Sequence, residues 1–138
     1  MEPLPTTRGR VVEELEVDLT GLKLEHSGTV KLPIRLPTYQ ARRDFMKPLE
    51  TFMALSSALD KQREAQEDTA TTRTQFTLEY ADMILRVRFD QLRSIIDVAR
   101  LDAADRAIIE HPEFVERVAV DEVGAIIDRF QRRLNLAG

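Results

Sequence analysis

The segment from Val30 to Met46 constrains the fold most, because the spacing of its apolar residues changes from that of a strand to that of a helix. Before Thr38, apolar and polar or proline residues alternate, and the apolar ones are Val30, Leu32, Ile34 and Leu36. After Thr38 the apolar residues continue at helical spacing, through Phe45, Leu49 and Phe52. A change from period 2 to period 3.6 predicts a joint between a β element and a helical part.

The residues before this joint predict a small antiparallel sheet. Residues 11–19 carry valines and leucines in near-alternation, and their valine content favours a strand over the competing helical interpretation. Turn signals at Thr20-Gly21 and at residues 26–29 flank a second alternating stretch at 22–25. Two or three strands follow from this pattern. Pro33 and Pro37 lack an N–H group, so their strand is expected at a sheet edge or paired on one side only.

Everything after Thr38 has a helical pattern. Thr38 is the expected N-cap of the first helix, and Pro48 predicts either a kink or a short turn at 39–46 followed by a new helix. Residues 67–72 are polar and predict a linker before a long second helix with a broad apolar face. Three further helix boundaries are expected, namely Asp102 as an N-cap with Asp105 in its first turn, His111-Pro112 as a helix end, and Asp121 as the N-cap of the last helix.

These patterns together predict an α+β fold that is mostly α. A short N-terminal antiparallel β-hairpin or small sheet is followed by a bundle of four to five helices. We expect residues 1–37 to form a tail and the β element and residues 38–138 to form the helical bundle, within one compact domain. A chain of 138 residues is long enough for a single hydrophobic core.

The chain lacks the residue patterns that usually carry catalysis or bind cofactors. It has no cysteine, no glycine-rich phosphate loop and only two histidines, His26 and His111. Ser56-Ser57 has no nearby base in the sequence, and the carboxylates near His111 are explained by helix capping. We therefore expect no enzyme activity, no cofactor and no metal site.

Charge and hydropathy argue against nucleic-acid and membrane partners. The net charge is −4, and the arginine clusters are interleaved with aspartates. The short helices expected at 102–118 could form a helix-turn-helix, but Glu110, Glu113 and Glu116 are unsuited to phosphate contact. No apolar run approaches the roughly 20 residues that span a bilayer, and the first residues carry no apolar signal segment. An intracellular protein is the expectation.

Methionines and phenylalanines share the apolar stripes of the first two helices. Such surfaces can accommodate varied partners, although the same side chains could instead fill the core of the monomer. The candidate partner-binding residues are Phe45, Met46, Leu49, Phe52, Met53, Leu85 and Phe89.

Two joints of the chain also resemble a known family. The first joint is Arg35-Leu36-Pro37-Thr38 together with the helix entry at 42–46. The second joint consists of a helix end near Phe89 and the start of the last helix within Val118–Ile127. Over residues 28–134 this outline resembles the tail assembly chaperones of long-tailed, siphophage-type bacteriophages. The chain departs from them in its longer N-terminus, residues 1–27, and in having no glycine-bearing turn after Phe89.

The resemblance implies a non-enzymatic protein in the host cytoplasm. Such chaperones bind the long helical tape-measure protein and keep it soluble until tail-tube subunits polymerise around it. The resemblance also implies a homo-oligomer, because several copies would coat one client. Two other functions stay open from the sequence: a structural or adaptor protein of the phage head–tail junction, and a small helical DNA-binding regulator.

Overall fold

The computed structural model describes residues 11–20 and 28–137. In this part of the chain a two-stranded antiparallel sheet is followed by five α-helices and one 3₁₀ turn. The elements are β1 (Val11–Glu16), β2 (Thr29–Ile34), α1 (Tyr39–Glu64), α2 (Ala70–Ile95), the 3₁₀ turn η1 (Val98–Arg100), α3 (Ala103–Glu110), α4 (Phe114–Arg117) and α5 (Val120–Ala137). The predicted mostly helical α+β fold is confirmed.

The sheet places alternate residues of both strands on its buried face. Val11 pairs with Ile34 and Leu15 pairs with Val30 in the antiparallel register. Leu15, Val30 and Ile34 are all buried, as period-2 alternation predicts. The stretch predicted as a possible third strand, residues 22–25, lies outside the described residues.

Pro33 does lie on an edge strand, but that edge is not open. Its carbonyl oxygen accepts a hydrogen bond from the Asp97 N–H (2.7 Å), and the Arg35 N–H donates to the Ile95 carbonyl (2.8 Å). The N and O atoms of one strand residue point to the same side of the strand. The N–H that Pro33 lacks would therefore face segment 95–97 and not β1. The expectation that this strand pairs on one side only is therefore wrong at this end of β2.

The other edge of the sheet is covered in the same way. The Asp18 N–H donates to the Arg117 carbonyl (2.8 Å), and the Ala119 N–H donates to the Glu16 carbonyl (3.0 Å). Segments 95–97 and 117–119 thus satisfy main-chain groups that an edge strand would otherwise expose.

The first helix begins where the sequence predicts but continues through its proline. The Thr38 hydroxyl accepts a hydrogen bond from the Ala41 N–H (3.1 Å), which confirms Thr38 as the N-cap. Pro48 lies inside the uninterrupted α1, so a separate turn at 39–46 is not formed. Proline lacks an N–H and its ring crowds the carbonyl four residues earlier, so Pro48 is a local cost that α1 tolerates.

The later helix boundaries are partly as predicted. The Asp105 N–H donates to the Asp102 side chain (2.7 Å), which confirms this cap, and α3 ends before His111. The predicted linker at 67–72 is too long, because α2 already begins at Ala70 behind its N-cap Thr69. Asp121 is not an N-cap, because α5 begins at Val120. The Asp121 carboxylate lies in the first turn of α5, where the helix dipole favours negative charge.

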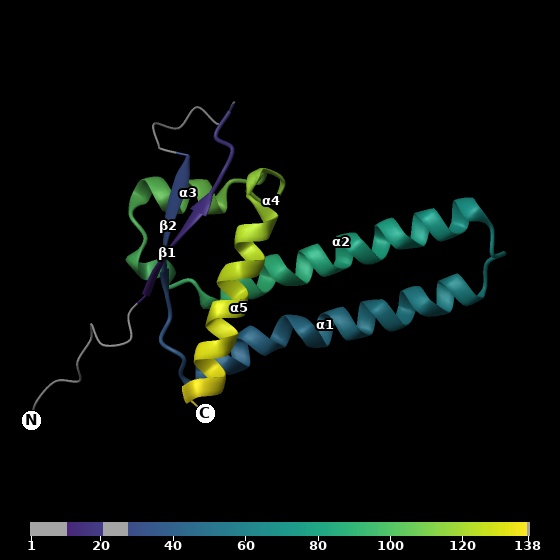
Figure 1. The fold of residues 1–138 in the computed structure, drawn as a ribbon, viewed down its shortest axis with the longest axis horizontal. Coiled ribbons are helices and arrows are strands. Elements are labelled where there is room, and N and C mark those ends of the chain that lie inside the picture. Colours follow the sequence, from purple (N-terminus) through teal and green to yellow (C-terminus); the bar gives the residue numbers. More distant parts are fainter. Residues whose placement is uncertain (1–10, 21–27, 138) are drawn as a thin grey trace, which may run out of the picture.

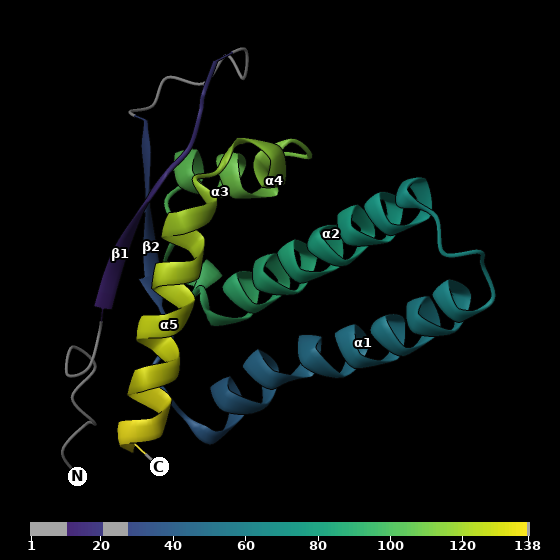
Figure 2. The same cartoon turned by 45° about the vertical axis from the view of Figure 1, so that its right-hand side comes forward.

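The sheet and the helices share one hydrophobic core. The core joins the buried face of the sheet to the beginning of α1, the end of α2, α3 and the length of α5. Figures 1 and 2 show that the rest of the α1–α2 hairpin projects away from this body. We call the hairpin, residues 39–95, the arm. In its projecting part, Leu59 and Phe76 are buried, although neither belongs to the main core.

Candidate partner-binding surface on the helical arm

Two of the seven candidate partner-binding residues lie inside the core. Phe45 and Phe89 are each 1% exposed. The Phe45 ring meets the Phe130 ring edge-on with centroids 5.3 Å apart, and the Phe89 ring meets Phe114 at 6.3 Å. These two phenylalanines therefore hold the base of the arm against α5 and α4, and in this conformation they offer almost no surface to a partner. Leu85 is half-buried and packs against the same core.

The remaining four candidates lie along one side of α1. Met46 is 46% exposed and Met53 is 69% exposed, and the two are seven residues apart, about two helical turns. Leu49 and Phe52 are half-buried beside them. An apolar surface that is this exposed is available for contact with another chain.

This side of the arm contains a groove of about 310 Å³, which we call the arm groove. Residues of α1, α2 and α5 line it: Phe45, Met46, Leu49, Phe52, Ile84, Val87, Arg88, Gln91 and Gln131. Four of the predicted residues thus meet in one groove. Ile84, which is 50% exposed, joins them from α2 and was not among the seven candidates.

Polar contacts hold the end of the arm groove that lies next to the body. The buried Gln91 amide donates to the Phe45 carbonyl at 3.4 Å, a long hydrogen bond between α2 and α1. Arg88 lies 3.7 Å from Asp128 of α5. The arm groove is therefore apolar along its length, with a guanidinium group at the body end, a pattern suited to an apolar helix with a polar flank.

A second apolar patch, which the sequence did not reveal, lies on the other side of the arm. Leu55 is 53% exposed and Leu78 is 66% exposed. They line a hollow of about 510 Å³, which we call the opposite flank, together with Ala58, Leu59, Gln62, Glu79, Asp82 and Met83. Leu55 lies off the helical stripe of Phe45, Leu49 and Phe52. This departure of Leu55 from the helical spacing is the sequence feature that could have indicated the second apolar patch.

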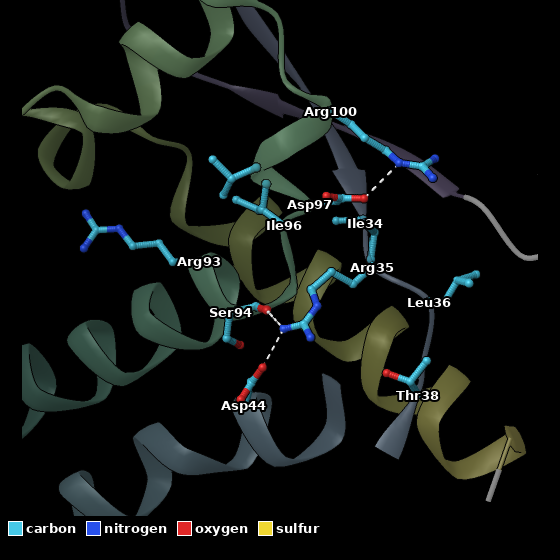
Figure 3. Close-up of a pocket in the computed structure, with 11 residues that line it drawn as sticks. Ile34, Arg35, Leu36, Thr38, Asp44, Arg93, Ser94, Ile96, Asp97 and Arg100 are labelled. Carbon is cyan, nitrogen blue, oxygen red and sulfur yellow. Dashed lines mark hydrogen bonds and ion pairs between the residues drawn. The ribbon is translucent and has the colours of Figure 1, made fainter. Parts of the chain in front are cut away.

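A basic groove of about 580 Å³ lies where the arm joins the sheet (Figure 3). The Arg35 guanidinium donates to the Asp44 carboxylate (2.8 Å) and to the Ser94 carbonyl (2.9 Å), and thereby links α1 to the end of α2. This hydrogen bonding from Arg35 lowers the pKa of Asp44 below its ordinary value of 3.8. Arg93 and Arg100 also line the groove, and Arg100 pairs with Asp97 at 2.9 Å.

His111 is the histidine that the structure describes. The His111 ring nitrogen Nδ1 accepts a hydrogen bond from the Glu113 N–H (3.1 Å), which is a local turn contact, and His26 lies outside the described residues. Within residues 11–20 and 28–137, no group of three or more histidine or acidic side chains is placed to hold a metal ion. In the same part of the chain, no helix combines the length and apolar composition needed to cross a membrane.

Comparisons of the chain with known protein families, with curated proteins and with solved structures found no match.

Proposed function

We propose that this protein is a non-enzymatic assembly chaperone of the phage-tail type, which binds an apolar helical segment of a tape-measure protein in the arm groove. The observation that carries the proposal is the exposure of Met46 and Met53 on a projecting two-helix arm. A third helix laid beside α1 and α2 would cover these side chains as a helix packs into a groove.

The arrangement of the molecule supports this kind of binding. The body contains the shared core and anchors the arm through Phe45 and Phe89, so the arm does not need its own exposed residues for folding. Methionine side chains are unbranched and flexible, and they can adapt to the many similar helical segments of a long client. The resemblance of residues 28–134 to tail assembly chaperones is what implies a tape-measure protein as the client.

Co-expression with a long helical tape-measure protein tests the proposal. We expect the client to become soluble and to co-purify with this protein. The double variant Met46→Gln with Met53→Gln should weaken capture about tenfold, because roughly 1.4 kcal/mol of apolar burial is lost. The control Leu55→Gln with Leu78→Gln changes two similarly exposed apolar residues on the opposite flank and should leave capture unchanged.

Other outcomes would reject the chaperone function or favour one of the two alternative functions. Unchanged client solubility and recovery would reject the chaperone function. Presence of the protein in purified mature particles would favour a head–tail junction component, since a chaperone leaves before maturation. Salt-sensitive retention on DNA would favour a regulator. A slippery heptamer near the 3′ end of the gene, with an overlapping downstream frame, would add independent support for the chaperone.

A further inference from the structure

The charges of the arm are separated along its length. The distal part, residues 60–82, has six acidic and three basic residues, a net charge of −3. The proximal part, residues 39–50 with 83–95, has six basic and three acidic residues, a net charge of +3. Between them, residues 51–59 of α1 carry no charge. The arm is therefore neutral as a whole but is acidic at its tip and basic at its base.

The basic groove, the opposite flank and the tip lie along one side of the arm. Asp44 lines the basic groove, whereas Leu55 and Gln62 line the hollow on the opposite flank. The three residues are 11 and 18 positions apart, which is about three and five helical turns, so they form one stripe of α1. On α2, Arg93 of the basic groove follows Asp82 of the hollow by 11 positions and shares its face.

The order of basic groove, opposite flank and acidic tip would match that of a second arm running in the opposite direction. At a rise of about 1.5 Å per residue, Asp44 lies about 16 Å from Leu55 towards the body. The turn that carries Glu67 and Asp68 lies at a similar distance from Leu55 towards the tip. A two-fold axis near Leu55 and Met83 would therefore bring the acidic turn of one arm to the basic groove of another.

We propose that two copies of this chain pair along the opposite flank, with their arms antiparallel. Leu55 and Leu78 of each copy would be covered at the centre, and the acidic turn of each copy would lie against Arg93 and the basic groove of the other. Such a contact is isologous, so it closes after two copies. It goes beyond the proposed function and leaves the arm groove, on the other side, free for a client.

The charged groups at the two ends are available for this contact. Arg93 is exposed and forms no ion pair with any residue that the structure describes. Among the residues that the structure describes, Asp68 pairs with Arg73 at 3.3 Å and with no other cation, and both side chains are mostly exposed. Exposed ion pairs contribute little individually, so the apolar centre should supply most of the affinity and the charges should fix the antiparallel direction.

Sedimentation equilibrium of the full chain tests the dimer. We expect a dimer whose dissociation constant rises with salt, because the charges at its ends are screened. Leu55→Gln with Leu78→Gln should weaken it at least about tenfold through loss of apolar burial. Asp68→Arg and Arg93→Glu should each weaken it by about tenfold through like-charge repulsion, and the two changes combined should recover most of that loss.

Circular dichroism of each variant verifies that the helices are retained, because all of the changed residues are on the surface. The matched control, Met46→Gln with Met53→Gln, changes α1 on the side of the arm groove and should dimerise like the wild type. A wild-type chain that stays monomeric at about 100 μM would overturn the proposal. So would unchanged dimerisation of the Leu55 and Leu78 variant, or no recovery in the combined charge reversal. Client capture that persists in such a case would leave the proposed function standing.

Discussion

Phe45 ties the base of the arm to the body. Its side chain is 1% exposed, and its ring meets Phe130 of α5 edge-on at 5.3 Å and an interplanar angle of 60°. Its carbonyl also accepts the hydrogen bond from Gln91 of α2. Replacing Phe45 should therefore destabilise the whole protein, although the sequence suggested it as a contact for a partner.

The cost of Phe45→Leu can be worked out from these contacts. Truncating a buried phenylalanine to alanine costs about 3–5 kcal/mol, which is a large part of the stability of a small domain. Leucine keeps most of the buried apolar surface but loses the edge-on aromatic contact, which is worth about 0.5–1.5 kcal/mol, and leaves a small void. We expect Phe45→Leu to lower the free energy of unfolding by about 1–2 kcal/mol.

Urea unfolding followed by circular dichroism gives this free energy directly. A double-mutant cycle with Phe130→Leu should show a coupling of about 0.5–1.5 kcal/mol between the two rings. The surface control Met53→Leu should stay within about 0.5 kcal/mol of the wild type. If Phe45→Leu were as stable as this control, the position of the ring in the core would be wrong.

Three further variants test local features. Asp102→Ala removes the N-cap of α3 and should cost about 1 kcal/mol in urea unfolding. Pro48→Ala restores a helical N–H inside α1 and should stabilise the protein by about 1–2 kcal/mol in thermal unfolding. The gain is smaller than the full cost of a helical proline, because proline also restricts the unfolded chain. Arg35 lowers the pKa of Asp44, so the stabilisation from this pair is complete above the ordinary value of 3.8 and is lost as the pH falls through the lower pKa of the folded state. The difference in Tm between wild type and Asp44→Asn should therefore be constant near neutral pH and should shrink below pH 3.8; an unchanged difference in acid would show that the Asp44 charge does not contribute.

Local side-chain signals explain why much of the fold could be predicted. Alternation in Val30–Ile34 identified a strand, because its apolar side chains line one face of the sheet. The hydroxyl of Thr38 and the carboxylate of Asp102 identified two helix starts, because a cap is formed by a residue and the N–H three positions later. Both kinds of signal lie within a few residues of the structure that they specify.

Features that depend on distant parts of the chain could not be predicted. The edges of the sheet are covered by main-chain hydrogen bonds from segments 95–97 and 117–119, and main-chain pairing leaves no side-chain pattern. Periodicity also placed Phe45 and Met53 together as partner-binding candidates. It could not show that Phe130 of α5 covers the first while the second lies on the projecting arm.

The binding of a client in the arm groove can be measured most directly with single cysteines, since the chain has none of its own. Met53→Cys places an environment-sensitive fluorophore on the arm groove side, and Ala54→Cys places it on the next residue of α1, about 100° further around the helix. Both sites are exposed, so the two labelled proteins should fold and respond alike without a client. On adding the tape-measure protein, we predict a blue shift and protection from quencher at position 53 and no change at position 54. Equal responses at the two positions, or none at position 53, would contradict binding in the arm groove.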